Sequence, residues 1–190
     1  MDLAAQEVLD FWFGELTPED WYRVDAALDD RIRDRWRPLW EQGRQGGFRE
    51  WIVAPDSCLA LIILLDQFPR NMFRGSALAF ASDRRALAVA KAAIDAGQDR
   101  RLALPRRGFL YLPFMHSELL VDQDRSVRLY LIAEGRGADH VRHARAHREV
   151  IRRFGRFPFR NAALGRPSTR EETAFLEAGG YASMLEEIAA

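Results

Sequence analysis

Hydrophobic positions recur at helical spacing along almost the whole chain, and the strict alternation typical of β-strands is almost absent. Val8, Leu9, Trp12 and Phe13 share one face of a first helix, which is expected to end at Gly14. Further helices are expected over about 25–45, 55–68, 82–97, 105–112, 117–134, 138–154 and 168–178. The pattern therefore predicts an all-α fold of about eight helices in stacked antiparallel pairs.

Two prolines are expected to disturb these helices. Pro38 lies inside the second helix and removes a backbone donor, which predicts a kink or break one turn earlier. Residues 58–65 are apolar on all sides, so the third helix should be central and surrounded by others. Pro69 follows this run and frees the carbonyl of Leu65, so this helix is expected to end or tighten around Phe68.

Length and composition indicate one soluble domain covering residues 1–190. The single cysteine, Cys58, can form no internal disulfide, which fits a reducing compartment. No apolar run approaches the ~20 residues needed to cross a bilayer, and the first residues carry acids rather than a basic leader. We therefore expect a cytoplasmic protein with no membrane partner.

The charges balance, with 28 basic and 28 acidic residues. Ten arginines lie between Arg136 and Arg170, but no interleaved aromatic residues or nucleic-acid-binding module accompany them. A solvated basic face is the simpler interpretation, and no nucleic-acid partner is expected.

Three polar phrases stand out from the helical background. The first is LDQFPRNMFRG (residues 65–75), and the second, FGRFPFRN (154–161), repeats its F-P and R-N elements. The third is YLPFMHSELL (111–120). They contain nine candidate ligand-binding residues, namely Asp66, Gln67, Arg70, Asn71, Arg74, His116, Glu118, Arg160 and Asn161.

Each phrase also has a purely structural interpretation. Asp66 and Arg70 are four residues apart and can form an ion pair at a helix end, whereas Arg70 and Arg74 repel each other unless anions intervene. Asn71 and Asn161 follow prolines and are typical of turns in which the side chain bonds local backbone.

The histidines carry weak signals for catalysis or metal binding. His116 precedes the expected helix cap Ser117, and its H-x-E spacing lacks the cysteine pair of zinc deaminases. His140, His143 and His147 are spaced for a helical metal site, but His147 also fits the core-facing stripe of its helix. No phosphate loop, nucleophile elbow or dinucleotide motif occurs, so we expect no metal and no cofactor.

Taken together, FWFG and the three phrases resemble the bacterial family called domain of unknown function 924, roughly from Val8 to Leu176. The resemblance implies a compact all-helical fold similar to right-handed tetratricopeptide superhelices, and it implies no activity. It places family motif positions on the nine candidates and also on Gln123, His147 and Arg156. The family usually has FGRFPHRN, so Phe159 replaces a histidine here. If that histidine were an essential acid, base or ligand, this member would be inactive.

We hypothesise that the three phrases converge on one concave, partly buried pocket. Three of their arginines, Arg70, Arg74 and Arg160, are candidate ligand-binding residues. The phrases supply only two candidate carboxylates, Asp66 and Glu118. Because burying an unmatched guanidinium is costly, the pocket is expected to bind a carboxylate or phosphate on an anionic small molecule or acidic peptide.

Two other functions stay open at this stage. One is a hydrolase-type enzyme in which His116 transfers a proton and is oriented by Glu118 or Asp66. The other is a polar network that only holds the helices in register, with any function on the outer surface.

Overall fold

The computed structural model describes residues 1–189, which form helices and connecting segments with no β-strand among them. The predicted all-α class is confirmed. The chain divides into two compact units, Met1–Leu110 and Tyr111–Ala190, called unit 1 and unit 2 below. Whether the two units form the single domain predicted from the sequence depends on how they associate, so that prediction stays a prediction.

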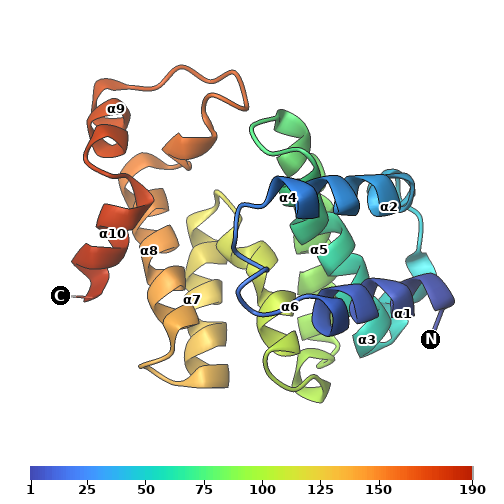
Figure 1. Ribbon diagram of the computed structural model, residues 1–190. Coiled ribbons are helices and arrows are strands. Elements are labelled where there is room, and N and C mark those ends of the chain that lie inside the picture. The colour runs from blue at the N-terminus through green and yellow to red at the C-terminus, as the bar shows by residue number, and fades with distance from the viewer. Residues whose placement is uncertain (190) are drawn as a thin grey trace. The chain divides into compact units, whose positions relative to one another are not determined.

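Unit 1 is built around a fully buried central helix. The helices of unit 1 are α1 (Leu3–Asp10), α2 (Ala26–Arg44), α3 (Pro55–Ile62), α4 (Phe68–Met72) and α5 (Asp83–Asp95), shown in Figure 1. Every side chain from Cys58 to Leu65 is completely buried, which confirms the central helix predicted from the apolar run. The aromatic rings of Phe11 and Trp36 pack on Phe68 with centroids 5.9 and 5.4 Å away.

The prediction that the third helix ends or tightens around Phe68 was wrong, because the helix widens and continues past this residue. After α3 the helix widens into one π-helical segment, η3 (Ile63–Gln67), and continues as α4 to Met72. A wider turn accommodates Pro69 because the freed carbonyl of Leu65 finds another donor. The hydroxyl of Ser82 donates to that carbonyl at 2.5 Å and accepts from Trp40 Nε1 at 2.9 Å.

The break predicted in α2 is also absent. The helix runs without interruption from Ala26 to Arg44 with Pro38 inside it. Trp36 and Trp40 are both buried on its inner face. Their packing outweighs the single backbone hydrogen bond that Pro38 removes.

We expect Ser82→Ala to lower the free energy of unfolding by about 2 kcal/mol. Ser82 is buried, and its loss leaves the Leu65 carbonyl and the Trp40 N–H without their partner. Urea unfolding followed by Trp fluorescence measures the difference. The control is Ser76→Ala, which removes an exposed hydroxyl bonded to the Leu78 amide and should cost less than about 1 kcal/mol. Equal losses in both variants would contradict this role for Ser82.

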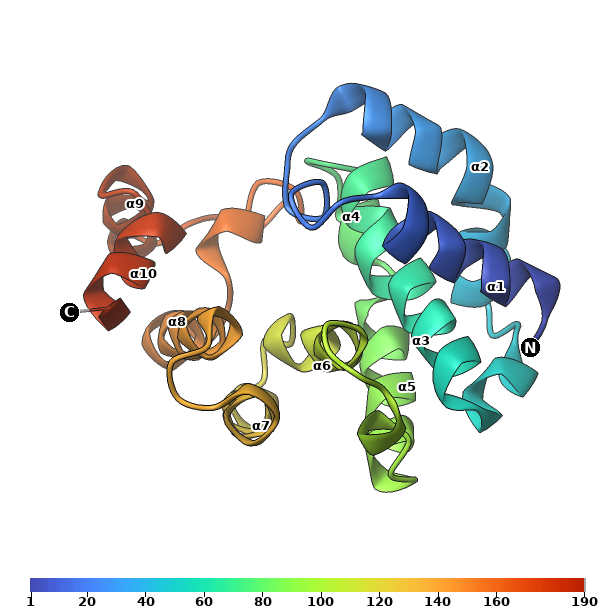
Figure 2. The same ribbon diagram turned by 60° about the horizontal axis from the view of Figure 1, so that its bottom comes forward.

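Unit 2 contains an antiparallel helix pair. Helix α6 (Arg106–Met115) spans the unit boundary and leads into α7 (Leu120–Glu134) and α8 (Asp139–Phe154). Both views show α7 and α8 side by side, joined by a short turn (Figures 1 and 2). The predicted pairing of successive helices is therefore present here. The tetratricopeptide-like superhelix stays a prediction.

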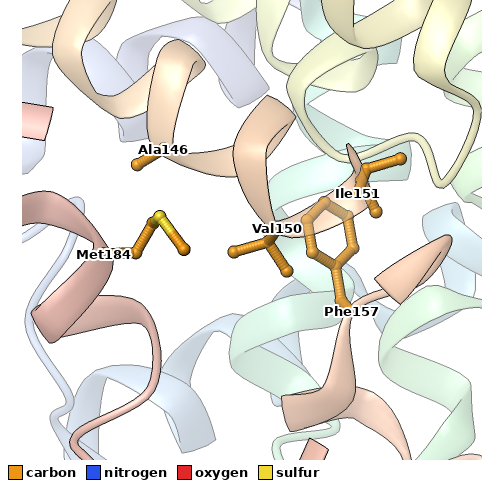
Figure 3. Close-up of a cluster of buried hydrophobic side chains, with 5 residues drawn as sticks. All are labelled: Ala146, Val150, Ile151, Phe157 and Met184. Carbon is orange, nitrogen blue, oxygen red and sulfur yellow. The ribbon is translucent and has the colours of Figure 1, made fainter. Parts of the chain in front are cut away.

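The end of the chain holds a helix that the sequence prediction missed. The expected last helix is α9 (Arg170–Glu177), and α10 (Tyr181–Ala189) follows after two glycines with positive φ. Tyr181, Met184, Leu185 and Ile188 have helical spacing, a signal that could have revealed α10. They pack onto α8 around a core shown in Figure 3 and formed by Ala146, Val150, Ile151, Phe157 and Met184.

No helix within residues 1–189 is long and apolar enough to span a lipid bilayer.

Candidate functional site

The first arginine of the 65–75 phrase forms ion pairs inside unit 1. Arg70 binds both carboxylate oxygens of Asp83, at 2.9 and 3.0 Å, and its Nη1 lies 3.5 Å from a carboxylate oxygen of Asp66. Burial alone would lower the pKa of Arg70, but Asp66 and Asp83 outweigh it, and the pKa is raised. Asp66 is fully buried and also accepts a hydrogen bond from Gln67.

The second arginine of this phrase is bound to a carboxylate on α2. Arg74 contacts both oxygens of Asp29, with Nε–Oδ2 at 2.5 Å and Nη2–Oδ1 at 3.1 Å. Asn71 donates to the same Asp29 carboxylate at 2.8 Å. The expectation that Asn71 bonds local backbone is therefore wrong, because its amide joins α4 to α2.

These contacts overturn the charge count that motivated the anion-binding hypothesis. Arg70 and Arg74 have carboxylate partners, Asp83 and Asp29, which lie on other helices and were not considered from the sequence. Neither arginine needs an external anion to neutralise it. In unit 1 the polar phrase therefore fixes α4 to its neighbours α2 and α5.

In unit 2, the 111–120 and 154–161 phrases meet through Arg166. This arginine binds both oxygens of Glu118, at 2.8 and 3.0 Å. Glu118 also accepts the backbone N–H of Phe157 at 2.9 Å. Burial tends to raise the pKa of Glu118, but the hydrogen bonds from Arg166 and Phe157 outweigh it and lower the pKa.

The network continues from Arg166 to α9. Asn161 accepts from Arg166 Nε at 3.0 Å and donates to Glu172 at 3.2 Å. Its side chain was expected to bond local backbone, but it bonds these side chains instead. Arg156 binds both oxygens of Glu172, at 2.6 and 2.8 Å. These bonds lower the pKa of Glu172 to about 2, and Glu172 also completes a capping box with Thr169. Asn161 and Glu118 thus secure the loop that carries Arg160.

A cluster of two imidazoles and one phenol, His143, His147 and Tyr181, lies between α8 and α10. Nδ1 of His147 donates to the His143 carbonyl at 2.9 Å and lies 3.0 Å from the Tyr181 hydroxyl. That hydroxyl lies 2.7 Å from His143 Nδ1. Because a carbonyl only accepts, Nδ1 of His147 carries the proton, and Tyr181 donates to His143.

The other ring nitrogen of His147, Nε2, is not used by the contacts with His143 and Tyr181. Burial lowers the pKa of His147 to about 3, and neighbouring His116 and Arg160 act in the same direction. The ring is therefore neutral at physiological pH, and Nε2 holds a lone pair. No hydrogen-bond partner of Nε2 occurs within residues 1–189.

Two predicted site residues lie beside His147. The His116 ring packs edge-on against it with centroids 6.3 Å apart. Buried Gln123 fixes the loop that carries His116 by donating to the carbonyls of Met115 and Ser117. The Arg160 guanidinium is buried, with its central carbon 4.5 Å from the centroid of the Phe157 ring, and that ring packs on His147 at 5.5 Å.

Phe159, which replaces the usual family histidine, lies at the margin of this group. Its side chain is 44% exposed and stacks on Phe157 with ring centroids 5.2 Å apart. Its ring is 6.3 Å from that of Tyr181. Phe159 therefore takes no part in the hydrogen bond that holds His147 to the His143 carbonyl and lies at the edge of the cluster.

The nine predicted residues thus fall into two sets. Asp66, Gln67, Arg70, Asn71 and Arg74 belong to unit 1, whereas His116, Glu118, Arg160 and Asn161 belong to unit 2. The prediction that Arg70 and Arg160 line one pocket joins both sets and stays a prediction. Within residues 1–189, no group of three or more His, Cys, Asp or Glu side chains is placed to hold a metal ion.

Comparison with known proteins places the chain in a family. The sequence profile described as "Bacterial protein of unknown function (DUF924)" matches residues 8–180. The chain belongs to the DUF924 family. A DUF924 assignment agrees with the resemblance carried by the three phrases, and it assigns no activity.

A solved structure supports the fold of this DUF924 member. It is that of ATU0120, a protein of unknown function from Agrobacterium tumefaciens, which is 40% identical with a TM-score of 0.86. The match covers 92% of this chain and 97% of that one. No curated protein matches the chain.

Proposed function

We propose that this DUF924 protein binds an anionic small molecule in unit 2, at a site formed by His116, His147 and Arg160. The observation that carries the proposal is the neutral His147 ring, whose unbonded Nε2 lies in the neighbourhood of a buried guanidinium.

His147 is held in one tautomer and one orientation. Its Nδ1–H bond to the His143 carbonyl and its contact with Tyr181 fix the ring before any ligand arrives. A fixed acceptor of this kind selects a ligand that presents an O–H or N–H donor. Preorganisation of the ring also reduces the entropy lost on binding.

The charges around the ring favour an anion. Arg160 is buried, and its positive charge depresses the pKa of both His147 and Glu118. The carboxylate of Glu118 is paired with Arg166. A ligand that joins a negative group to a hydrogen-bond donor, such as hydrogen phosphate or a hydroxy acid, complements both features.

The geometry supports binding better than catalysis. Glu118 is bound by Arg166 and by the Phe157 N–H and makes no hydrogen bond to His116, which argues against its predicted role as the orienter of His116. His147, with a pKa of about 3, is poorly matched to general-base catalysis near neutral pH. The hydrolase alternative therefore depends on His116 and Asp66, a pairing that stays a prediction.

The test is a binding assay with His147→Asn. Asparagine keeps a donor near the position of Nδ1 but has no group at the position of Nε2. We expect calorimetry with phosphate, glycolate and short acidic peptides to identify a ligand of wild-type protein with a Kd tighter than about 1 mM. His147→Asn should weaken that ligand about tenfold, in keeping with one lost hydrogen bond.

The matched control is His140→Asn, which changes another histidine of α8 that contacts Glu134 instead. It should bind the ligand as wild type does. Equal binding by His147→Asn and wild type would refute the proposal, as would failure of every anion in the panel to bind folded protein. Tighter binding of acidic peptides than of small anions would shift the proposal to the peptide class.

A further inference from the structure

A hollow lies in unit 1, on residues that the site above does not use. It has a volume of about 380 Å³ and lies between α5 and the 3₁₀ segment η2 (Arg49–Val53). Its lining comprises Arg49, Ile52, Arg85, Ala88, Val89 and Ala92. The volume falls within the range of small-ligand sites.

One helix face builds most of this hollow. Arg85, Ala88, Val89 and Ala92 follow the i, i+3, i+4, i+7 spacing and therefore lie on one side of α5. The two alanines end at Cβ, so the helix surface stays open between larger neighbours. With Ile52 opposite, the walls are apolar.

Two arginines at this apolar wall have no carboxylate partner. Arg85 donates from Nη2 to the Gly47 carbonyl at 2.7 Å, its Nε is buried without an acceptor, and its Nη1 makes no hydrogen bond. Arg49 forms no ion pair within residues 1–189. This differs from Arg70 and Arg74, whose charges are matched within the unit.

From this combination we infer that the hollow binds an aliphatic carboxylate, of the kind represented by a medium-chain fatty acid. The carboxylate would accept hydrogen bonds from Arg85 Nη1 and Arg49, and the alkyl chain would lie on Ala88, Val89 and Ala92. Each part of the ligand answers a separate feature of the hollow, since the arginines favour the charge and the apolar wall favours the chain. The inference is independent of the site in unit 2.

The experiment is a ¹H–¹⁵N NMR titration of the full chain with octanoate, with octanol as the uncharged analogue. We expect octanoate to shift the amides of α5 around Ala88 and Ala92 in a saturable way, and octanol to bind at least about threefold more weakly. Arg85→Gln should weaken octanoate about three- to tenfold. Arg84→Gln changes the adjacent arginine, which does not line the hollow, and should leave binding unchanged.

A second variant separates binding from folding. Ala88→Leu keeps a good helix former at a solvent-exposed position and fills the hollow, so octanoate should lose its saturable shifts while the helical spectrum is kept. Three results would overturn the inference: equal binding of octanol and octanoate, equal losses in Arg84→Gln and Arg85→Gln, or α5 shifts that depend on protein concentration instead of octanoate. The last result would assign the face to self-association.

Discussion

Replacement of Asp29 by alanine is expected to lower the free energy of unfolding by about 3 kcal/mol. Asp29 is 6% exposed and is the shared acceptor of Arg74 and Asn71, so its loss leaves a guanidinium and an amide without their partner. Breaking a fully buried pair costs about 3–5 kcal/mol, and the partial exposure of Arg74 places the expected loss at the lower end. Chemical denaturation followed by circular dichroism measures it.

A matched control is available on the same helix. Asp30→Ala removes the neighbouring carboxylate, which pairs with Arg33 at the surface and should cost less than about 1 kcal/mol. A double-mutant cycle of Asp29→Ala with Arg74→Ala should give a coupling energy of at least about 1 kcal/mol. Additive effects in that cycle would mean that Arg74 is not held by Asp29. They would contradict the role of the 65–75 phrase in fixing α4 to α2.

The second large effect is a pH dependence of stability that originates in His147. Its pKa is about 3 in the folded protein against 6.5 as the reference value, so the unfolded chain binds the proton more tightly. The contribution of His147 to the free energy of unfolding is therefore fully present above pH 6.5 and is lost as the pH falls towards 3. The slope expected from this one group is about 1.4 kcal/mol per pH unit within that window.

The His147→Asn variant isolates this contribution. Carboxylates with depressed pKa values, such as Glu172 at about 2 against 4.5, also destabilise the protein in acid, but only below pH 4.5. The free energy of unfolding measured between pH 7 and 4.5 should therefore lose most of its slope in His147→Asn and keep it in His140→Asn. Burial also lowers the pKa of His143, which accounts for the slope that stays in His147→Asn. A slope of the same size in wild type and His147→Asn would show that His147 is not held neutral by burial.

Periodicity was sufficient for the fold class because helical spacing is a local property of the chain. The same reasoning located the buried helix at residues 58–65, since a run that is apolar on all sides must be surrounded. It failed at Pro69, because the donor that rescues the Leu65 carbonyl is Ser82, 17 residues later. A long-range hydrogen bond decided the local geometry, and no window of sequence contains it.

Long-range contacts also limited what the sequence could indicate about the candidate site. The residues that the phrases singled out make strong polar contacts, but the partners in these contacts lie far along the chain. Asp29 is 45 residues from Arg74, and Arg166 is 48 residues from Glu118. A charge count restricted to the phrases therefore left Arg70 and Arg74 unmatched when they were not. His147 was interpreted as a core-facing residue, and its free nitrogen became visible only with the orientation of its ring.

The state of the His147 ring with and without ligand is the most direct test of the binding proposal. Long-range ¹H–¹⁵N NMR of the imidazoles at pH 7 reports the protonation of each ring nitrogen. We predict that His147 is neutral with its proton on Nδ1, and that the Nε2 resonance alone shifts strongly when an anionic ligand with a donor group binds. A protonated Nε2 in the free protein, or an unchanged Nε2 signal in the saturated complex, would contradict the proposal.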